Sequence, residues 1–145
     1  MEATWGDNNP LTDWHRAATI CGNKVLDIAP HWLIIVAGLN YQLDLTGVSL
    51  KTVNLKVKNK LVYSGHLYSF SWPPGWASFN YESFKKKLFN SQFFVRGLGY
   101  PFILGEFGNN KQDNLWNYLI RYLKETDVDW IYWPLDGFKC EADDP

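Results

Sequence analysis

Four short apolar runs recur along the chain, and each one ends in a polar or glycine-containing cluster. The runs cover residues 33–36, 61–64, 102–104 and 130–133. Continuous apolar runs of this length are typical of strands that are covered on both faces. The pattern therefore predicts four strands, extending at most one or two residues beyond these runs.

Helical spacing of apolar residues separates the predicted strands. Residues 13–28 form an amphipathic segment, for which Asp13 is a suitable N-cap and Pro30 marks the end. Residues 114–125 carry apolar side chains at helical spacing, namely Leu115, Tyr118, Leu119 and Tyr122. Residues 78–94 also have helical character. Alternating strands and helices predict an α/β fold with one parallel sheet, whose strands follow chain order through right-handed crossovers.

The number of these strand–helix units limits the architecture. Four units are half of an eightfold (β/α)8 barrel, and a whole barrel needs roughly 250 residues. The chain has 145 residues. The sequence thus predicts one half-barrel domain over residues 1–145.

Composition and charge exclude several other classes of protein. Hydrophobic residues make up 46% and the formal net charge is −1, so the chain is globular and lacks the clustered positive face of nucleic-acid-binding proteins. The longest apolar run, residues 32–37, is too short to cross a membrane, and the first residues do not resemble a signal peptide. Cys21 and Cys140 can pair or stay free. No spacing typical of metal ligands or of a cofactor-binding glycine loop is present.

Aromatic residues are unusually abundant, at 17% of the chain. About half of them are expected in the core, but flat rings also stack on the apolar faces of sugars. Trp72 and Trp76 flank a Pro-Pro turn, where a loop would display them, and Trp133 closes the fourth strand. Each of these three is a candidate sugar-binding platform.

Candidate chemistry lies where the strands end, which is where (β/α)8 enzymes place their active sites. Glu106 follows a buried apolar run, and a carboxylate there is costly unless it is paired or hydrogen-bonded. The alternative is an ordinary surface glutamate just past the strand. His66 and Tyr68 are two residues apart at the end of the second strand, so both side chains point to the same side.

Four segments in the same order resemble glycoside hydrolase family 5, the cellulase-type family with a (β/α)8 barrel. They are residues 33–41, 59–68, 101–108 and 129–137. The resemblance implies that Glu106 is the nucleophile of a retaining glycosidase and that His66 and Tyr68 assist it. It also implies that Trp133 is a sugar platform, that the substrate is a β-1,4-glucan and that the protein is secreted.

The resemblance covers only the later part of the family's barrel. The family's acid/base glutamate, which ends its fourth strand, would lie just before Met1, and Glu2 falls in the following link rather than at that position. Ala37 stands where the family often has Glu, and no final helix follows the fourth strand. The domain is therefore expected to be truncated at both ends relative to the family.

A half site leaves three possibilities open. Another carboxylate, such as Asp44 or Glu82, could replace the acid/base. Two copies could associate through their open edges, because inward side chains would otherwise meet water; these side chains are Leu33, Ile35, Val62, Ile103 and Ile131. The chain could also be a non-catalytic module that binds glucan through Trp133, Trp72 and Trp76.

Overall fold

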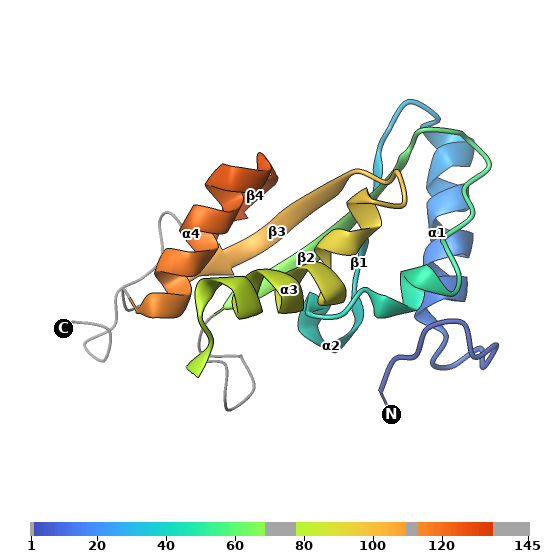
Figure 1. Cartoon of the computed structure of the whole chain (residues 1–145). Coiled ribbons are helices and arrows are strands. Elements are labelled where there is room, and N and C mark those ends of the chain that lie inside the picture. The colour runs from blue at the N-terminus through green and yellow to red at the C-terminus, as the bar shows by residue number, and fades with distance from the viewer. Residues whose placement is uncertain (1, 69–77, 110–112, 135–145) are drawn as a thin grey trace, which may run out of the picture.

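A computed structural model describes residues 2–68, 78–109 and 113–134 of the chain. Its centre is one parallel sheet in the order β1-β2-β3-β4 (Figure 1). The strands are β1 (Ile34–Ala37), β2 (Leu61–Tyr68), β3 (Phe102–Gly108) and β4 (Asp129–Tyr132). The predicted four parallel strands in chain order are thus confirmed, and β2 and β3 run further toward their carboxyl ends than the apolar runs alone.

Each long helix begins at a residue whose side chain caps it. Asp13, Asn80 and Asp113 accept hydrogen bonds from backbone amides three residues later. The helices they begin are α1 (Trp14–Ile28), α3 (Tyr81–Ser91) and α4 (Asn114–Thr126). The helix predicted over residues 78–94 was too long at both ends. Its carboxyl end is interrupted because Gln92 has φ −139° and ψ −54°, and the chain continues as the 3-10 helix η4 (Phe93–Arg96).

Asp13 does more than cap α1. Its carboxylate also accepts hydrogen bonds from the amides of Gly6 and Asn8, and so fastens the first loop to the helix. Burial acts to raise the pKa of Asp13, but these bonds to the amides of Arg16, Gly6 and Asn8 outweigh it and lower the pKa below its ordinary value.

The hydrophobic core lies between the sheet and its helices. Figure 1 shows α3 and α4 crossing in front of the sheet and α1 standing beside β1. Large buried side chains of the strands face this layer, namely Val36, Tyr63, Leu67, Leu104 and Phe107. The phenol of Tyr63 accepts a hydrogen bond from the amide of Val53 (3.0 Å), and burial raises the pKa of Tyr63 to about 12.

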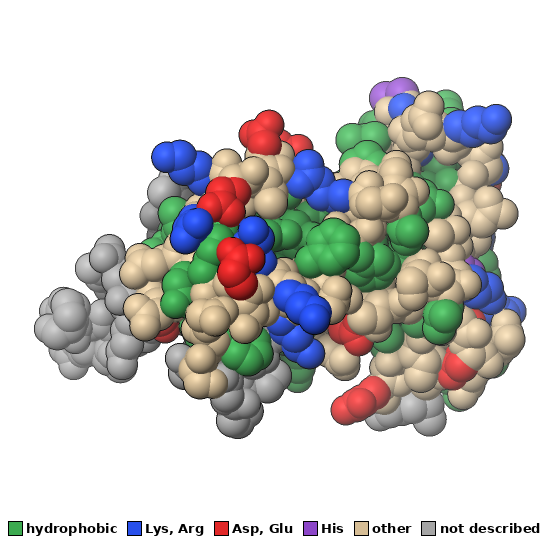
Figure 2. Space-filling model, in the orientation of Figure 1, with side chains coloured by type: hydrophobic (Ala, Val, Ile, Leu, Met, Phe, Trp, Pro, Cys, Tyr) green, Lys and Arg blue, Asp and Glu red, His purple; other side chains and the backbone are tan. Residues whose placement is uncertain are grey.

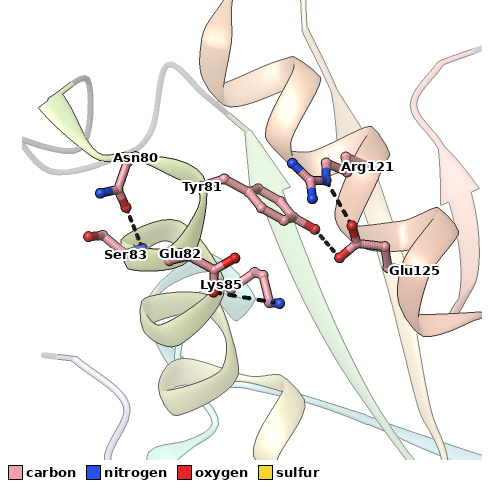
Figure 3. Close-up of polar contacts among 7 residues, drawn as sticks. All are labelled: Asn80, Tyr81, Glu82, Ser83, Lys85, Arg121 and Glu125. Carbon is pink, nitrogen blue, oxygen red and sulfur yellow. Dashed lines mark hydrogen bonds and ion pairs between the residues drawn. The ribbon is translucent and has the colours of Figure 1, made fainter.

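A polar cluster joins α3 to α4 on the outside of this layer (Figure 3). Tyr81 donates a hydrogen bond to Glu125 (2.6 Å), and Arg121 donates to the other oxygen of Glu125 (2.8 Å). The Arg121 guanidinium also lies 3.9 Å from the centre of the Tyr81 ring. Figure 2 shows the same face from outside, where charged side chains of both signs lie over the two helices. This face is therefore an ordinary solvated helix layer.

The opposite, inner face of the sheet has no covering layer in the described part of the chain. Leu33, Ile35 and Ile131 are exposed by 59%, 58% and 52%. Val62 and Ile103 are half-buried. The inward apolar side chains of the predicted half barrel thus meet solvent at the edges of the sheet and are only partly shielded in its middle.

The turn that follows β1 is left-handed. Its short segment α2 (Leu39–Gln42) contains three successive non-glycine residues at positive φ, which are Asn40 (51°), Tyr41 (57°) and Gln42 (65°). Each costs about 1–2 kcal/mol relative to the right-handed form. Leu39 and Asp44 hold the base of the turn through two backbone hydrogen bonds (2.8 and 3.2 Å). Such strain persists only where surrounding contacts enforce it.

The fold is that of a half barrel of the (β/α)8 type: within the described residues, four parallel strands form one sheet with one face covered by helices and one face open. None of the helices in the described ranges combines the length and the apolar character that crossing a membrane requires.

Candidate active site

A hollow of about 320 Å³ lies on the open inner face, toward the carboxyl ends of the strands. All four strands contribute to its lining: Ile35, Ala37, Ser64, His66, Ile103, Gly105 and Ile131. Gln42, from the left-handed turn, closes one side. The lining is largely apolar, with His66 as its one ionisable residue among those described. This is the position of the active site in (β/α)8 enzymes.

An extra residue in β3 turns Glu106 toward His66, which is one of the residues that line this hollow. Gly65 pairs with Leu104, but the next residue of β2, His66, pairs with Glu106, so Gly105 has no counterpart. The pairing of β3 with β4 shifts over the same stretch of β3. Regular alternation would turn the residue at position 106 toward the helix layer. The bulge shifts this alternation by one residue, so that Phe107 packs in the core. Glu106 is left half-buried at the end of the strand.

Glu106 contacts both polar residues of β2. The hydroxyl of Tyr68 donates a short hydrogen bond to Oε1 of Glu106. Nδ1 of His66 lies 3.6 Å from Oε2, which is close enough for an ion pair when the imidazole is protonated. The two side chains that the sequence placed on one side of the strand end therefore meet the same carboxylate.

The environment sets the protonation of these partners at neutral pH. Burial lowers the pKa of His66 below its ordinary value of 6.5, against an opposing effect of the Glu106 charge, so the imidazole is neutral. Burial also raises the pKa of Tyr68, as do its hydrogen bond to Glu106 and the charge of that residue. Tyr68 is thus a hydrogen-bond donor throughout the neutral range.

Two glycines of β3 allow this arrangement. At both positions, neighbouring atoms occupy the space where the Cβ of any other residue would lie. At Gly105 a Cβ would lie 2.3 Å from Oγ of Ser64, and at Gly108 it would lie 2.4 Å from the carbonyl oxygen of Trp133. A side chain at Gly105 would force the Ser64 hydroxyl to move, and one at Gly108 would force the backbone at Trp133 to move. The bulge was not foreseen from the sequence, although a glycine directly before the glutamate is the signal that could have indicated it.

Trp133 lies at the same end of the sheet. Its amide donates to the carbonyl of Phe107 (2.9 Å), and its side chain is 58% exposed. An exposed indole at the carboxyl end of the sheet is suited to stacking on a sugar ring. The other two candidate platforms, Trp72 and Trp76, lie outside the described residues.

The two carboxylates considered as replacements for the acid/base have other partners. Asp44 accepts hydrogen bonds from the amide and the hydroxyl of Thr46 (2.8 and 2.6 Å), the first residue of the 3-10 helix η1 (Thr46–Ser49). Glu82 lies in the first turn of α3, 3.7 Å from Nζ of Lys85, in the helix layer of Figure 3. Neither contact involves Glu106.

Cys21 is exposed on α1, whereas Cys140 lies outside the described residues. Within residues 2–68, 78–109 and 113–134, three or more potential metal-ligating side chains nowhere gather into a cluster.

Comparison with known proteins identifies the family of the chain. The family model for cellulase (glycosyl hydrolase family 5) matches residues 1–139. An endoglucanase of Paenibacillus polymyxa is 33% identical over 93% of this chain, and the major extracellular endoglucanase of Xanthomonas campestris is 27% identical over 90%. The chain spans 39% and 31% of these two relatives.

Solved structures show the same relationship. The chain matches an endocellulase from Pyrococcus horikoshii, solved in complex with cellotetraose, with a TM-score of 0.81 and 32% identity. That match covers 93% of this chain and 44% of the other. It matches the catalytic domain of the Xanthomonas endoglucanase with a TM-score of 0.79 and 25% identity, over 94% of this chain and 46% of that domain. The chain therefore belongs to glycosyl hydrolase family 5, the cellulase family, and its fold corresponds to less than half the length of these relatives.

Proposed function

We propose that the chain carries the nucleophile half of a retaining β-1,4-glucanase active site. The observation that carries the proposal is the contact of one half-buried carboxylate, Glu106, with both Tyr68 and His66 beside an open apolar hollow. Relatives named as endoglucanases, and the cellotetraose complex of the similar endocellulase, support glucan as the substrate class.

In this proposal Glu106 attacks the anomeric carbon of a bound glucan. One carboxylate oxygen forms a bond to that carbon while the bond to the leaving oxygen breaks, and the leaving oxygen takes the electron pair. Tyr68 holds one oxygen of the carboxylate through its hydrogen bond, and the second oxygen lies on the side of His66. The neutral imidazole of His66 hydrogen-bonds a sugar hydroxyl, and the exposed ring of Trp133 stacks on the sugar.

The second carboxyl of a retaining site protonates the leaving oxygen and later activates water. We infer that residues 2–68, 78–109 and 113–134 do not supply it, since the only carboxylate for which these ranges give a contact with Tyr68 or His66 is Glu106. General acid–base catalysis contributes about 10²–10⁴-fold. An unactivated glucan should therefore be cleaved very slowly by the chain alone, whereas a substrate with a good leaving group should still react with Glu106.

A leaving-group experiment tests this assignment. With 2,4-dinitrophenyl β-cellobioside, which needs no protonation to depart, we expect a burst of about one dinitrophenolate per chain followed by slow turnover. Turnover is slow because no base activates the water that must attack the glycosyl–enzyme. Azide, which needs no deprotonation, should accelerate the slow phase.

Two controls make the result specific. Glu106→Gln should abolish the burst because the amide is a poor nucleophile. Glu82→Gln, a change of the same kind in the helix layer, should leave the burst unchanged. A chain that binds cellotetraose but gives no burst would indicate a non-catalytic glucan-binding module instead, in which Trp133 and, by sequence alone, Trp72 and Trp76 hold the sugar.

We further propose that a second copy of the chain covers the open face. In the described part of the chain, β1 and β4 are both edge strands, and Leu33, Ile35 and Ile131 are more than half exposed beside them. Two four-stranded sheets supply the eight strands of a closed barrel, and a two-fold axis is the commonest way to pair identical chains. Light scattering should give the mass of a dimer.

We also propose that the protein is secreted, which is supported by the relative named as extracellular.

A further inference from the structure

We propose that Gln92 is a positioning residue of the active site: its buried amide replaces the missing end of β1 and holds the backbone of His66 in place. The inference rests on the proposed function of His66 and Glu106. Gln92 is fully buried at the end of α3 and touches none of the reacting groups.

The pairing of β1 with β2 shows what the amide replaces. The amides of Ile34 and Gly38 donate to the carbonyls of Lys60 and Ser64, so alternate carbonyls of β2 face β1. The next carbonyl in this series belongs to His66. No strand amide can reach it from β1, because β1 ends at Ala37 and the chain then enters the left-handed turn. The side-chain amide of Gln92 donates to this carbonyl instead (3.0 Å).

The side-chain nitrogen of Gln92 also holds the left-handed turn that follows β1. Nε2 of Gln92 donates its second hydrogen to the carbonyl of Leu43 (3.1 Å), and the carbonyl of the neighbouring Ser91 accepts from the amide of Leu45 (2.9 Å). The end of α3 thus fastens both the catalytic end of β2 and the segment that carries Gln42 into the hollow.

Packing fixes the other end of the amide. Oε1 of Gln92 is buried and has no hydrogen-bond partner among the described residues. A Cβ at Gly65 would lie only 2.2 Å from it, so the amide fits against the backbone just before His66. An unsatisfied buried oxygen is costly. A side chain chosen only for stability would avoid it, which favours a role for the two N–H donors.

Loss of the hydrogen bond from Gln92 should affect the imidazole of His66. Among the described residues, the titratable groups that face it are the Glu106 carboxylate, 3.6 Å away, and beyond that the Tyr68 hydroxyl. Burial holds the pKa of His66 low. Loss of the bond to its carbonyl should let the end of β2 loosen and hydrate, which should raise that pKa toward 6.5.

The test is an NMR titration of the three histidines in the full chain and in Gln92→Met, which keeps the length of the side chain but has no donor. We expect the midpoint of His66 to rise by at least about 0.3 units, with His15 and His31 as internal references. Tyr81→Phe is the matched control, since it removes a different hydrogen bond of α3, the one to Glu125 in Figure 3.

An unchanged midpoint in Gln92→Met, or an equal change in Tyr81→Phe, would overturn the inference. If Gln92→Met does not fold, Gln92→Asn, which keeps the amide on a shorter side chain, is measured by the same criteria. Cellotetraose binding is measured on the same samples. A wild-type chain that binds no cellotetraose refutes the proposed function, while the His66 midpoint still decides the role of Gln92.

Discussion

Gly65 lies so close to Gln92 that Gly65→Ala should destabilise the fold, and the distances involved indicate by how much. An alanine Cβ at position 65 would lie 2.2 Å from Oε1 and 2.8 Å from Cδ of Gln92, and 3.1 Å from Cζ of Phe102. Two of these three contacts are shorter than real Cβ atoms show. Gln92 cannot swing aside freely because it is fully buried and its amide is held by two carbonyls.

Overpacking of this kind costs about 1–3 kcal/mol. We expect Gly65→Ala to fall at the upper end of that range and to lower Tm by roughly 4–10 °C in a chain of this size. Gln92→Ala removes the two closest contacts and, of the three nearest, leaves the one to Phe102 at 3.1 Å. In that background, Gly65→Ala should cost less than about 1 kcal/mol, giving a coupling of about 1–2 kcal/mol.

Urea unfolding of the two single variants and the double variant measures this coupling. Gly97→Ala is the control for the change of residue type, because its Cβ would meet only the carbonyl of Phe94 at 3.2 Å. It should alter the free energy of unfolding by no more than about 0.5 kcal/mol. If Gly65→Ala costs the same with and without Gln92, the packing described here is wrong.

Three further predictions concern the site, the first helix and the open face. Tyr68→Phe removes the hydrogen bond to Glu106. We expect the burst rate with the dinitrophenyl substrate to fall about 10–100-fold, with Tm nearly unchanged. An unchanged burst rate would contradict the role of Tyr68. Asp13→Ala should destabilise the chain by about 2 kcal/mol in thermal unfolding. Because the pKa of Asp13 is lowered by folding, its contribution should be complete above the ordinary value of 3.8 and lost as the pH falls through the lower folded value. Ile35→Lys should convert a dimer to a monomer in light scattering, whereas Lys86→Ala in the helix layer should not.

The sheet could be predicted because it depends on patterns local to each strand. The runs that became β1 to β4 are apolar enough to be covered, and right-handed crossovers between successive parallel strands leave one order. The spacing of two residues between His66 and Tyr68 was sufficient to place both on one side of β2. Asp13 was identified as a cap from its position before an amphipathic segment.

The remaining features depend on contacts between distant parts of the chain. The bulge at Gly105 is defined by pairing with β2 and β4 on both sides, and no local pattern contains that register. The role of Gln92 depends on the carbonyl of His66, 26 residues earlier, which β1 is too short to reach. The left-handed turn at Asn40 runs against intrinsic backbone preference and exists only because its base and its far end are held.

The most direct test of the central claim, that Glu106 is a glycosidase nucleophile, is to trap its covalent product. The reagent is 2,4-dinitrophenyl 2-deoxy-2-fluoro-β-cellobioside, whose fluorine slows hydrolysis of the glycosyl–enzyme and whose leaving group needs no acid. Mass spectrometry of the digested protein locates the modified residue. We predict one fluorocellobiosyl group per chain, on Glu106, and none in Glu106→Gln. An unlabelled chain, or a label on any other residue, would contradict the account.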